Sequence, residues 1–181
     1  ALWIWNLAQD RFPHARQRLD LFHAEEHLWA VAHDLYGHDT PEAVAWVKPL
    51  LQQVRDDQTV AVIASLGELK PRLLEAQQKK VQTQIEYFEH NAQRMKYKEI
   101  LEARDACEKG KATEQQKDLA NHPVGSGAIE SACRQYQCRF KRTGQFWTTA
   151  GDEALMSLET LWRNGRWDQL YPHARSPAAL N

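Results

Sequence analysis

The chain has 181 residues, of which 43% are hydrophobic, and its seven tryptophans can help to fill a core, which excludes a disordered protein. The formal net charge of −1 excludes a uniformly basic nucleic-acid-binding protein, so any contact with DNA has to come from a local patch. Three cysteines without a C-x-x-C pair favour a reducing compartment, and in the absence of a long apolar run or a signal peptide we expect a cytoplasmic protein with no membrane partner.

A helical pattern opens the chain and is followed by a short extended segment. Apolar residues recur at helical spacing over residues 1–8, and because the chain starts inside this pattern without methionine, we expect it to be cut from a longer protein. The plainer alternative is removal of a methionine before Ala1. After the break at Phe12 and Pro13, residues 16–20 are the better of two candidate strands. Asp20 would then lie at the end of a strand.

The next two helices are marked by their caps. Apolar spacing predicts a helix over residues 24–36 that ends at Gly37, and Thr40 with Pro41 supplies the N-cap and first turn of another. The core face expected for this second helix consists of Ala43, Val47, Leu50, Leu51 and Val54.

Two further helices complete a predicted antiparallel bundle. One is expected over residues 59–69, and a longer one follows Pro71. The apolar face of the longer helix is expected to hold Leu74, Val81, Ile85 and Phe88. We therefore predict a mainly α fold.

The sequence from residue 105 to residue 121 contains almost nothing to bury, and we interpret it as a mobile polar linker. Beyond it, helices are predicted over residues 128–139 and over residues 150–163, the latter capped by Thr148 or Thr149.

A glycine-rich turn precedes the first of these late helices. Gly125 and Gly127 flank Ser126 and would permit positive φ and a close backbone approach just before the helix, which would present Glu130 in the first helical turn. A carboxylate in that position is well placed to bind a cation. The plainer interpretation is an ordinary loop-to-helix junction in which Glu130 pairs with Arg134 on the surface.

A basic segment follows. Between positions 121 and 150, four Lys or Arg residues face one acidic residue, and the run at 139–147, RFKRTGQFW, interleaves basic and aromatic side chains. That pattern suits phosphate contact and base stacking by Arg139, Lys141, Arg142 and Trp147, although a solvated surface gives a similar pattern.

Residues 23–27, HAEEH, carry a competing signal. This is the H-x-x-E-H signature of the inverted zinc peptidases, with His23 and His27 as zinc ligands and Glu26 as the base. A third protein ligand is needed, and only Glu102 or Glu108 can be nominated by distance in the sequence. The alternative is that His27 and His33 are ordinary surface or half-buried histidines of a helix.

An ordered set of segments resembles one protein family, the Kra-type insertion-sequence transposases related to the Mutator group. The resemblance covers almost the whole chain. Its segments are ALWIWNL at 1–7, FPHA at 12–15, LDLFHAEEHL at 19–28, RMKY at 94–97, VGSGAIESAC at 124–133, RFKRTGQFW at 139–147, Trp162 and GRWD at 165–168.

The resemblance implies an RNase H-like α/β catalytic core, Asp-Asp-Glu chemistry with Mg²⁺ or Mn²⁺, and DNA as partner at the transposon ends and target, with possible homo-oligomers and association with the nucleoid. Glu130 matches the last catalytic carboxylate and a metal ligand, and Asp20 with His23 matches an accessory Asp-x-x-His element. The implied division is a partial core at 1–37, a helical insertion at 38–104, the linker at 105–121 and C-terminal core helices at 122–181.

The first two catalytic aspartates of this family precede the position that matches Ala1. We therefore expect a C-terminal piece of a transposase, inactive alone. The alternatives are the zinc peptidase and a helical module without catalytic activity that binds DNA or protein.

Overall fold

The computed structural model describes residues 2–170, and this part of the chain is mainly helical, as the sequence predicts. Contacts between residues divide the chain into two compact units, Ala1–Ser126 and Gly127–Asn181, and each is described by itself. None of the helices found within residues 2–170 has the length and apolar character needed to cross a bilayer.

The described residues contain no β-strand, and this corrects the expectation of a strand at residues 16–20. The backbone N–H of Leu19 donates to the carbonyl of Arg94 (3.0 Å), whereas that of Leu21 donates to the carbonyl of Val124 (2.8 Å). These two backbone N–H groups therefore bond to two different segments, whereas a β-strand forms a ladder of hydrogen bonds with one partner strand. Residues 2–170 therefore do not support an RNase H-like α/β core.

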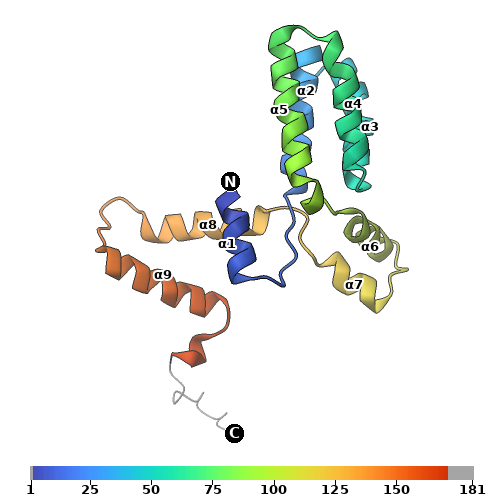
Figure 1. Cartoon of the computed structure of the whole chain (residues 1–181). Coiled ribbons are helices and arrows are strands. Elements are labelled where there is room, and N and C mark those ends of the chain that lie inside the picture. The colour runs from blue at the N-terminus through green and yellow to red at the C-terminus, as the bar shows by residue number, and fades with distance from the viewer. Residues whose placement is uncertain (1, 171–181) are drawn as a thin grey trace. The chain divides into compact units, whose positions relative to one another are not determined.

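Four helices of the first unit form a bundle: α2 (Leu21–Tyr36), α3 (Pro41–Arg55), α4 (Thr59–Leu69) and α5 (Glu75–Asn91) (Figure 1). Short connections join consecutive helices and place them side by side. Their buried apolar side chains, which are each worth about 1.5–3 kcal/mol when large, form the core of the unit. The bundle positions in this core are Leu21, Ala24, Leu28, Val31, Ala32, Ala43, Val47, Leu50, Val54, Val62, Leu66, Val81, Ile85 and Phe88.

Most predicted core positions of the bundle are confirmed, with two differences. Leu51 is only partly buried against the core. Leu74 is 76% exposed because it is the N-cap residue of α5 and precedes the first helical turn. The helical spacing that predicted Leu74 on the same apolar face as Val81 was therefore extended too far toward the N-terminus.

The predicted caps between α2 and α3 are confirmed. Gly37 ends α2 with a φ of 90°, in the left-handed region that favours glycine. The hydroxyl of Thr40 accepts the N–H of Ala43 (3.2 Å) and donates to the carbonyl of Tyr36 (3.0 Å), so one side chain satisfies groups of both helices.

The segment predicted as a linker contains helical structure instead. Helix α6 (Lys98–Glu108) extends into it, and α7 (Glu114–Ala120) lies within it. A capping box between Thr113 and Gln116 starts α7. At its other end the guanidinium of Arg104 donates to the carbonyls of Ala120 (3.0 Å) and His122 (2.8 Å), which fixes the segment against α6.

The second unit holds two longer helices, α8 (Gly127–Phe140) and α9 (Thr149–Arg163), followed by the short η3 (Trp167–Gln169). Thr148 caps α9, as one of the two predicted candidates. The remaining elements belong to the first unit and are α1 (Leu2–Arg11) and two short 3-10 turns, η1 (Lys70–Arg72) and η2 (Ala92–Arg94).

Candidate functional site

The carboxylate of Asp20 joins the start of α2 to Ser126, the last residue of the first unit. Its Oδ1 accepts the backbone N–H of His23 (3.0 Å) and caps α2, while its Oδ2 accepts both the hydroxyl (2.6 Å) and the backbone N–H of Ser126. Burial acts to raise the pKa of Asp20, but the bonds from Ser126, His23 and Phe22 outweigh it and hold the pKa below its ordinary value. Asp20 is therefore ionised at neutral pH and is already occupied by donors on both oxygens.

The turn that contains Ser126 lies close against the start of α2. A Cβ added to Gly125 would come within 2.9 Å of the Phe22 ring, so glycine is needed there for a close approach. The expected positive φ is wrong, because Gly125 and Gly127 are absent from the described glycines with positive φ. Nothing lies within 4 Å of a Cβ added at Gly127, which is the first residue of α8.

Two residues that sequence reasoning missed hold the same segment in place. The guanidinium of Arg18 donates to the carbonyl of Lys96 through Nε (2.9 Å) and to that of Pro123 through Nη1 (2.8 Å). The hydroxyl of Tyr97 donates to the carbonyl of Leu19 (3.1 Å), and burial, followed by the nearby Tyr87 and Asp20, raises the pKa of that hydroxyl so that it stays a donor. Neither role has a local sequence signal, although Tyr97 belongs to the RMKY segment of the resemblance.

His23 is placed by Asp20 only through its backbone. Its ring nitrogen Nδ1 lies 3.1 Å from a carboxylate oxygen of Glu26, and both side chains are more than 60% exposed, at 62% and 73%. The Asp-x-x-His element is therefore a helix cap in this structure, with the imidazole directed to the next turn of α2.

Within residues 2–170, the H-x-x-E-H segment has no third ligand beside it. The rings of His23 and His27 have centroids 5.3 Å apart, but Nδ1 of His27 is hydrogen-bonded to Gln84 Oε1 (2.6 Å) and its ring stacks on Tyr87 at 3.6 Å. Among residues 2–170, no three or more His, Cys, Asp or Glu side chains are grouped so that they could hold a metal ion. The donor sets expected for Zn²⁺ and for a Mg²⁺ or Mn²⁺ pair are thus not assembled within the described part of the chain.

Glu130 lies in the first turn of α8, as predicted, and is exposed. It belongs to the second unit, whereas Asp20 and Ser126 belong to the first. A carboxylate there is a suitable oxygen ligand for a hard divalent cation. The expectation that Glu130 meets Asp20 or His23 at one site stays a prediction.

Three side chains of the basic segment make defined contacts. Arg139 is paired with Glu159 at 3.1 Å, and Nε of Arg142 donates to the carbonyl of Cys138 (2.7 Å). The indole N–H of Trp147 donates to the carbonyl of Phe140 (3.0 Å), which orients a ring that is 45% exposed. Lys141 is exposed at the end of α8.

Comparison of the chain with protein-family models, with curated proteins and with solved structures gave no match.

Proposed function

We propose that this chain is the C-terminal part of a DNA transposase, to which it contributes Glu130 as one of three metal-binding carboxylates and a basic surface that binds DNA. The site would cut a DNA strand and transfer the freed end, with carboxylates brought together from distant parts of the chain. The resemblance places the other two carboxylates in sequence that precedes the position of Ala1.

The junction between Asp20 and Ser126 carries this proposal. These residues are 106 positions apart, and they belong to the two segments on which the resemblance depends most, the Asp-x-x-His element and the glycine turn before Glu130. A site of this kind requires distant segments to be held together, and a charged hydrogen bond with two donors from one residue is a strong way to do it.

Within this proposal Asp20 is a positioning residue and not a metal ligand. Both of its oxygens accept hydrogen bonds from the backbone or side chain of the same unit, and binding a cation would cost those bonds. Glu130 is the residue proposed to touch the metal. Cleavage is proposed only for the chain together with the two carboxylates that the resemblance implies.

A nicking assay on supercoiled plasmid with Mg²⁺ or Mn²⁺ tests the proposal. The 181-residue chain is expected to leave the plasmid intact. The same chain extended by the upstream residues of its gene should cleave, and Glu130→Gln should abolish that cleavage because the amide keeps the shape and removes the charge. Glu153→Gln, an exposed change on α9, is the matched control and should retain activity.

Two results would overturn the proposal. Cleavage by the extended chain that survives Glu130→Gln would remove Glu130 from the site. Metal-dependent cleavage by the 181-residue chain, lost in Glu130→Gln, would show that no upstream carboxylate is needed.

A non-catalytic DNA-binding module is the second candidate, because the arginines of the second unit form a cationic pocket that requires no metal. Stable DNA binding by the extended chain without cleavage would favour it.

A further inference from the structure

Three arginines of the second unit line one pocket. The pocket has a volume of about 500 Å³ and lies between α8, the turn that follows it and α9. It is lined by Gln135, Cys138, Arg139, Arg142, Gln145 and Arg163. Half of these residues carry a positive charge and none carries a negative one, which makes the pocket attractive to anions.

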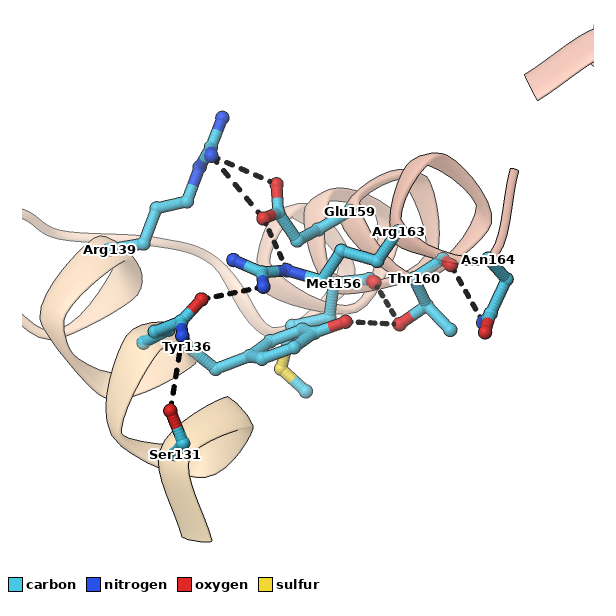
Figure 2. Close-up of polar contacts among 9 residues, drawn as sticks. Ser131, Tyr136, Arg139, Met156, Glu159, Thr160, Arg163 and Asn164 are labelled. Atoms are coloured by element: carbon cyan, nitrogen blue, oxygen red, sulfur yellow. Dashed lines mark hydrogen bonds and ion pairs between the residues drawn. The ribbon is translucent and has the colours of Figure 1, made fainter. Parts of the chain in front are cut away.

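A buried carboxylate holds two of the three arginines. Glu159 is only 6% exposed, and its oxygens lie 3.1 Å from Nη1 of Arg139 and 2.8 Å from Nε of Arg163 (Figure 2). Arg163 also donates through Nη1 to Gln135 Oε1 (2.7 Å), and its guanidinium lies 5.3 Å from the centre of the Tyr136 ring. Both guanidinium groups are thus fixed before any ligand arrives.

The third arginine is fixed by the turn after α8. Nε of Arg142 donates to the carbonyl of Cys138 (2.7 Å), and its backbone N–H donates to Gln145 Oε1 (3.1 Å). Gln145 N–H in turn donates to the carbonyl of Arg142 (3.0 Å), and Gly144 between them has a φ of 85°, which favours glycine. The turn is therefore closed from both sides.

The arginines retain donors for a ligand. A guanidinium has five N–H groups in a planar fork that matches phosphate oxygens. The hydrogen bonds found within the described residues use Nη1 of Arg139, Nε of Arg142, and Nε with Nη1 of Arg163. Nη2 of each arginine is not used by them, so each guanidinium keeps N–H donors.

We propose that this three-arginine pocket binds a phosphate oxyanion and that Glu159 is the positioning residue that aims Arg139 and Arg163 at it. Resting on the proposed function, the phosphate is a phosphodiester of a DNA strand. The three guanidinium groups and the one carboxylate have a net charge of +2, which can neutralise one or two phosphates of a DNA strand. The proposal adds Arg163 and Glu159, from α9, to the basic run at the end of α8.

The role of Glu159 can be separated from its charge. A carboxylate beside DNA repels phosphate, so if Glu159 only neutralised the arginines, Glu159→Gln would strengthen binding. If Glu159 aims the two guanidinium groups, the same change weakens binding although the unit has become more positive. The two explanations predict opposite signs.

The test uses the full chain and a fluorescein-labelled DNA duplex of arbitrary sequence, titrated between about 50 and about 200 mM salt. Loss of one phosphate contact should reduce the slope of log K against log salt by about 0.9. When the salt concentration is raised across that range, the factor by which affinity falls should therefore be about 3 times smaller for Arg163→Gln than for the parent. Arg166→Gln, three residues away and outside the pocket lining, should behave as the parent does. Glu159→Gln should bind more weakly than the parent at every salt concentration.

Circular dichroism and thermal unfolding identify variants that no longer fold. If Arg163→Gln is one of them, Arg142→Gln replaces it, because the guanidinium of Arg142 does not touch Glu159. If Arg163→Gln and Arg142→Gln both keep the parental slope, or Glu159→Gln binds more tightly, the pocket inference is overturned. A slope lowered by Lys141→Gln in the same series would leave the proposed DNA binding intact.

A second arm titrates inorganic phosphate while the Nε–Hε signals of Arg139, Arg142 and Arg163 are followed by NMR, with chloride at equal ionic strength as the control. Phosphate-specific shifts without DNA binding would keep the pocket as a phosphate site and remove the proposed function. With neither shifts nor DNA binding, both proposals fall.

Discussion

At the scale of single residues, the carboxylate of Asp20 links two segments of the first unit that are 106 positions apart. It caps α2 through His23 and holds the turn at Ser126 through two donors. Asn in its place can still accept from His23, but its Nδ2 cannot accept from Ser126.

We expect Asp20→Asn to lower the free energy of unfolding by about 1–2 kcal/mol, the low end for charged hydrogen bonds, because the cap is retained. Urea denaturation followed by circular dichroism measures the change. Asp10→Asn, an exposed change on α1 whose carboxylate pairs with the neighbouring Arg11, should stay within about 0.5 kcal/mol of the parent. An equal loss of unfolding free energy in both variants would show that the bonds from Ser126 to Asp20 do not stabilise the first unit.

The pH dependence of this contribution follows from the lowered pKa of Asp20. The unfolded chain binds the proton near the ordinary value of 3.8 and the folded chain only at lower pH, so the contribution is complete above 3.8 and is lost as the pH falls through the lowered pKa. The difference in unfolding free energy between the parent and Asp20→Asn should be constant from neutral pH to about pH 5 and should shrink below the ordinary value. A gap that stays constant below that value would contradict the assignment.

At the scale of elements, α7 depends on a contact from outside itself. A helix of seven residues is too short to be stable alone, and Arg104 of α6 donates to two carbonyls at its C-terminal end. Arg104→Met should therefore speed amide hydrogen exchange at residues 117–122, while α3 remains unchanged. Arg72→Met, at an exposed arginine outside this contact, is the control, and exchange at 117–122 that is equal in both variants would show that α7 does not need Arg104.

What the sequence could predict at this scale was local. The caps at Gly37 and Thr40 are set by residues within four positions of the helix ends, so the end of α2 and the start of α3 followed from them, whereas α2 starts at Leu21, earlier than the predicted residue 24. The capping box at Thr113 was an equally local signal for α7, but the lack of apolar spacing outweighed it. Arg104 and Arg18 act on carbonyls that only the tertiary fold brings near, and no pattern marks them.

The candidate site could also be predicted only where its features depend on residues near one another in the sequence. The position of Glu130 in the first turn of α8 and the close approach at Gly125 followed from the glycine turn. The bond between Asp20 and Ser126 could only be suspected, because it joins groups that sequence order separates. Glu159 and Arg163 were missed because their roles depend on how α9 meets α8.

At the scale of the whole molecule, the two units differ in how much they bury. The buried apolar side chains of residues 2–170 all lie before Ser126, whereas Glu159 is the buried residue of the second unit. Large apolar side chains there remain exposed, including Met156, Trp162 and Trp167. Polar contacts such as that between Tyr136 and Thr160 (2.8 Å) therefore contribute much of what joins α8 to α9.

We expect the second unit to open first. Amides of α8 and α9 should exchange with solvent faster than those of α2 to α5, because local stability follows buried apolar contact. Hydrogen exchange measured by mass spectrometry on the intact chain tests this, and equal protection of both units would show that they unfold together.

The contacts of Arg18 have a consequence for the time course of folding. They span 78 positions to Lys96 and 105 positions to Pro123, while most contacts of the α2 to α5 bundle join helices that are neighbours in sequence. Contacts between segments that are near in sequence form first, because closing a long loop costs conformational entropy before its distant contacts can stabilise the chain. The bundle should then form in the transition state and the Arg18 and Asp20 contacts after it, so that Asp20→Asn accelerates unfolding and leaves the refolding rate nearly unchanged.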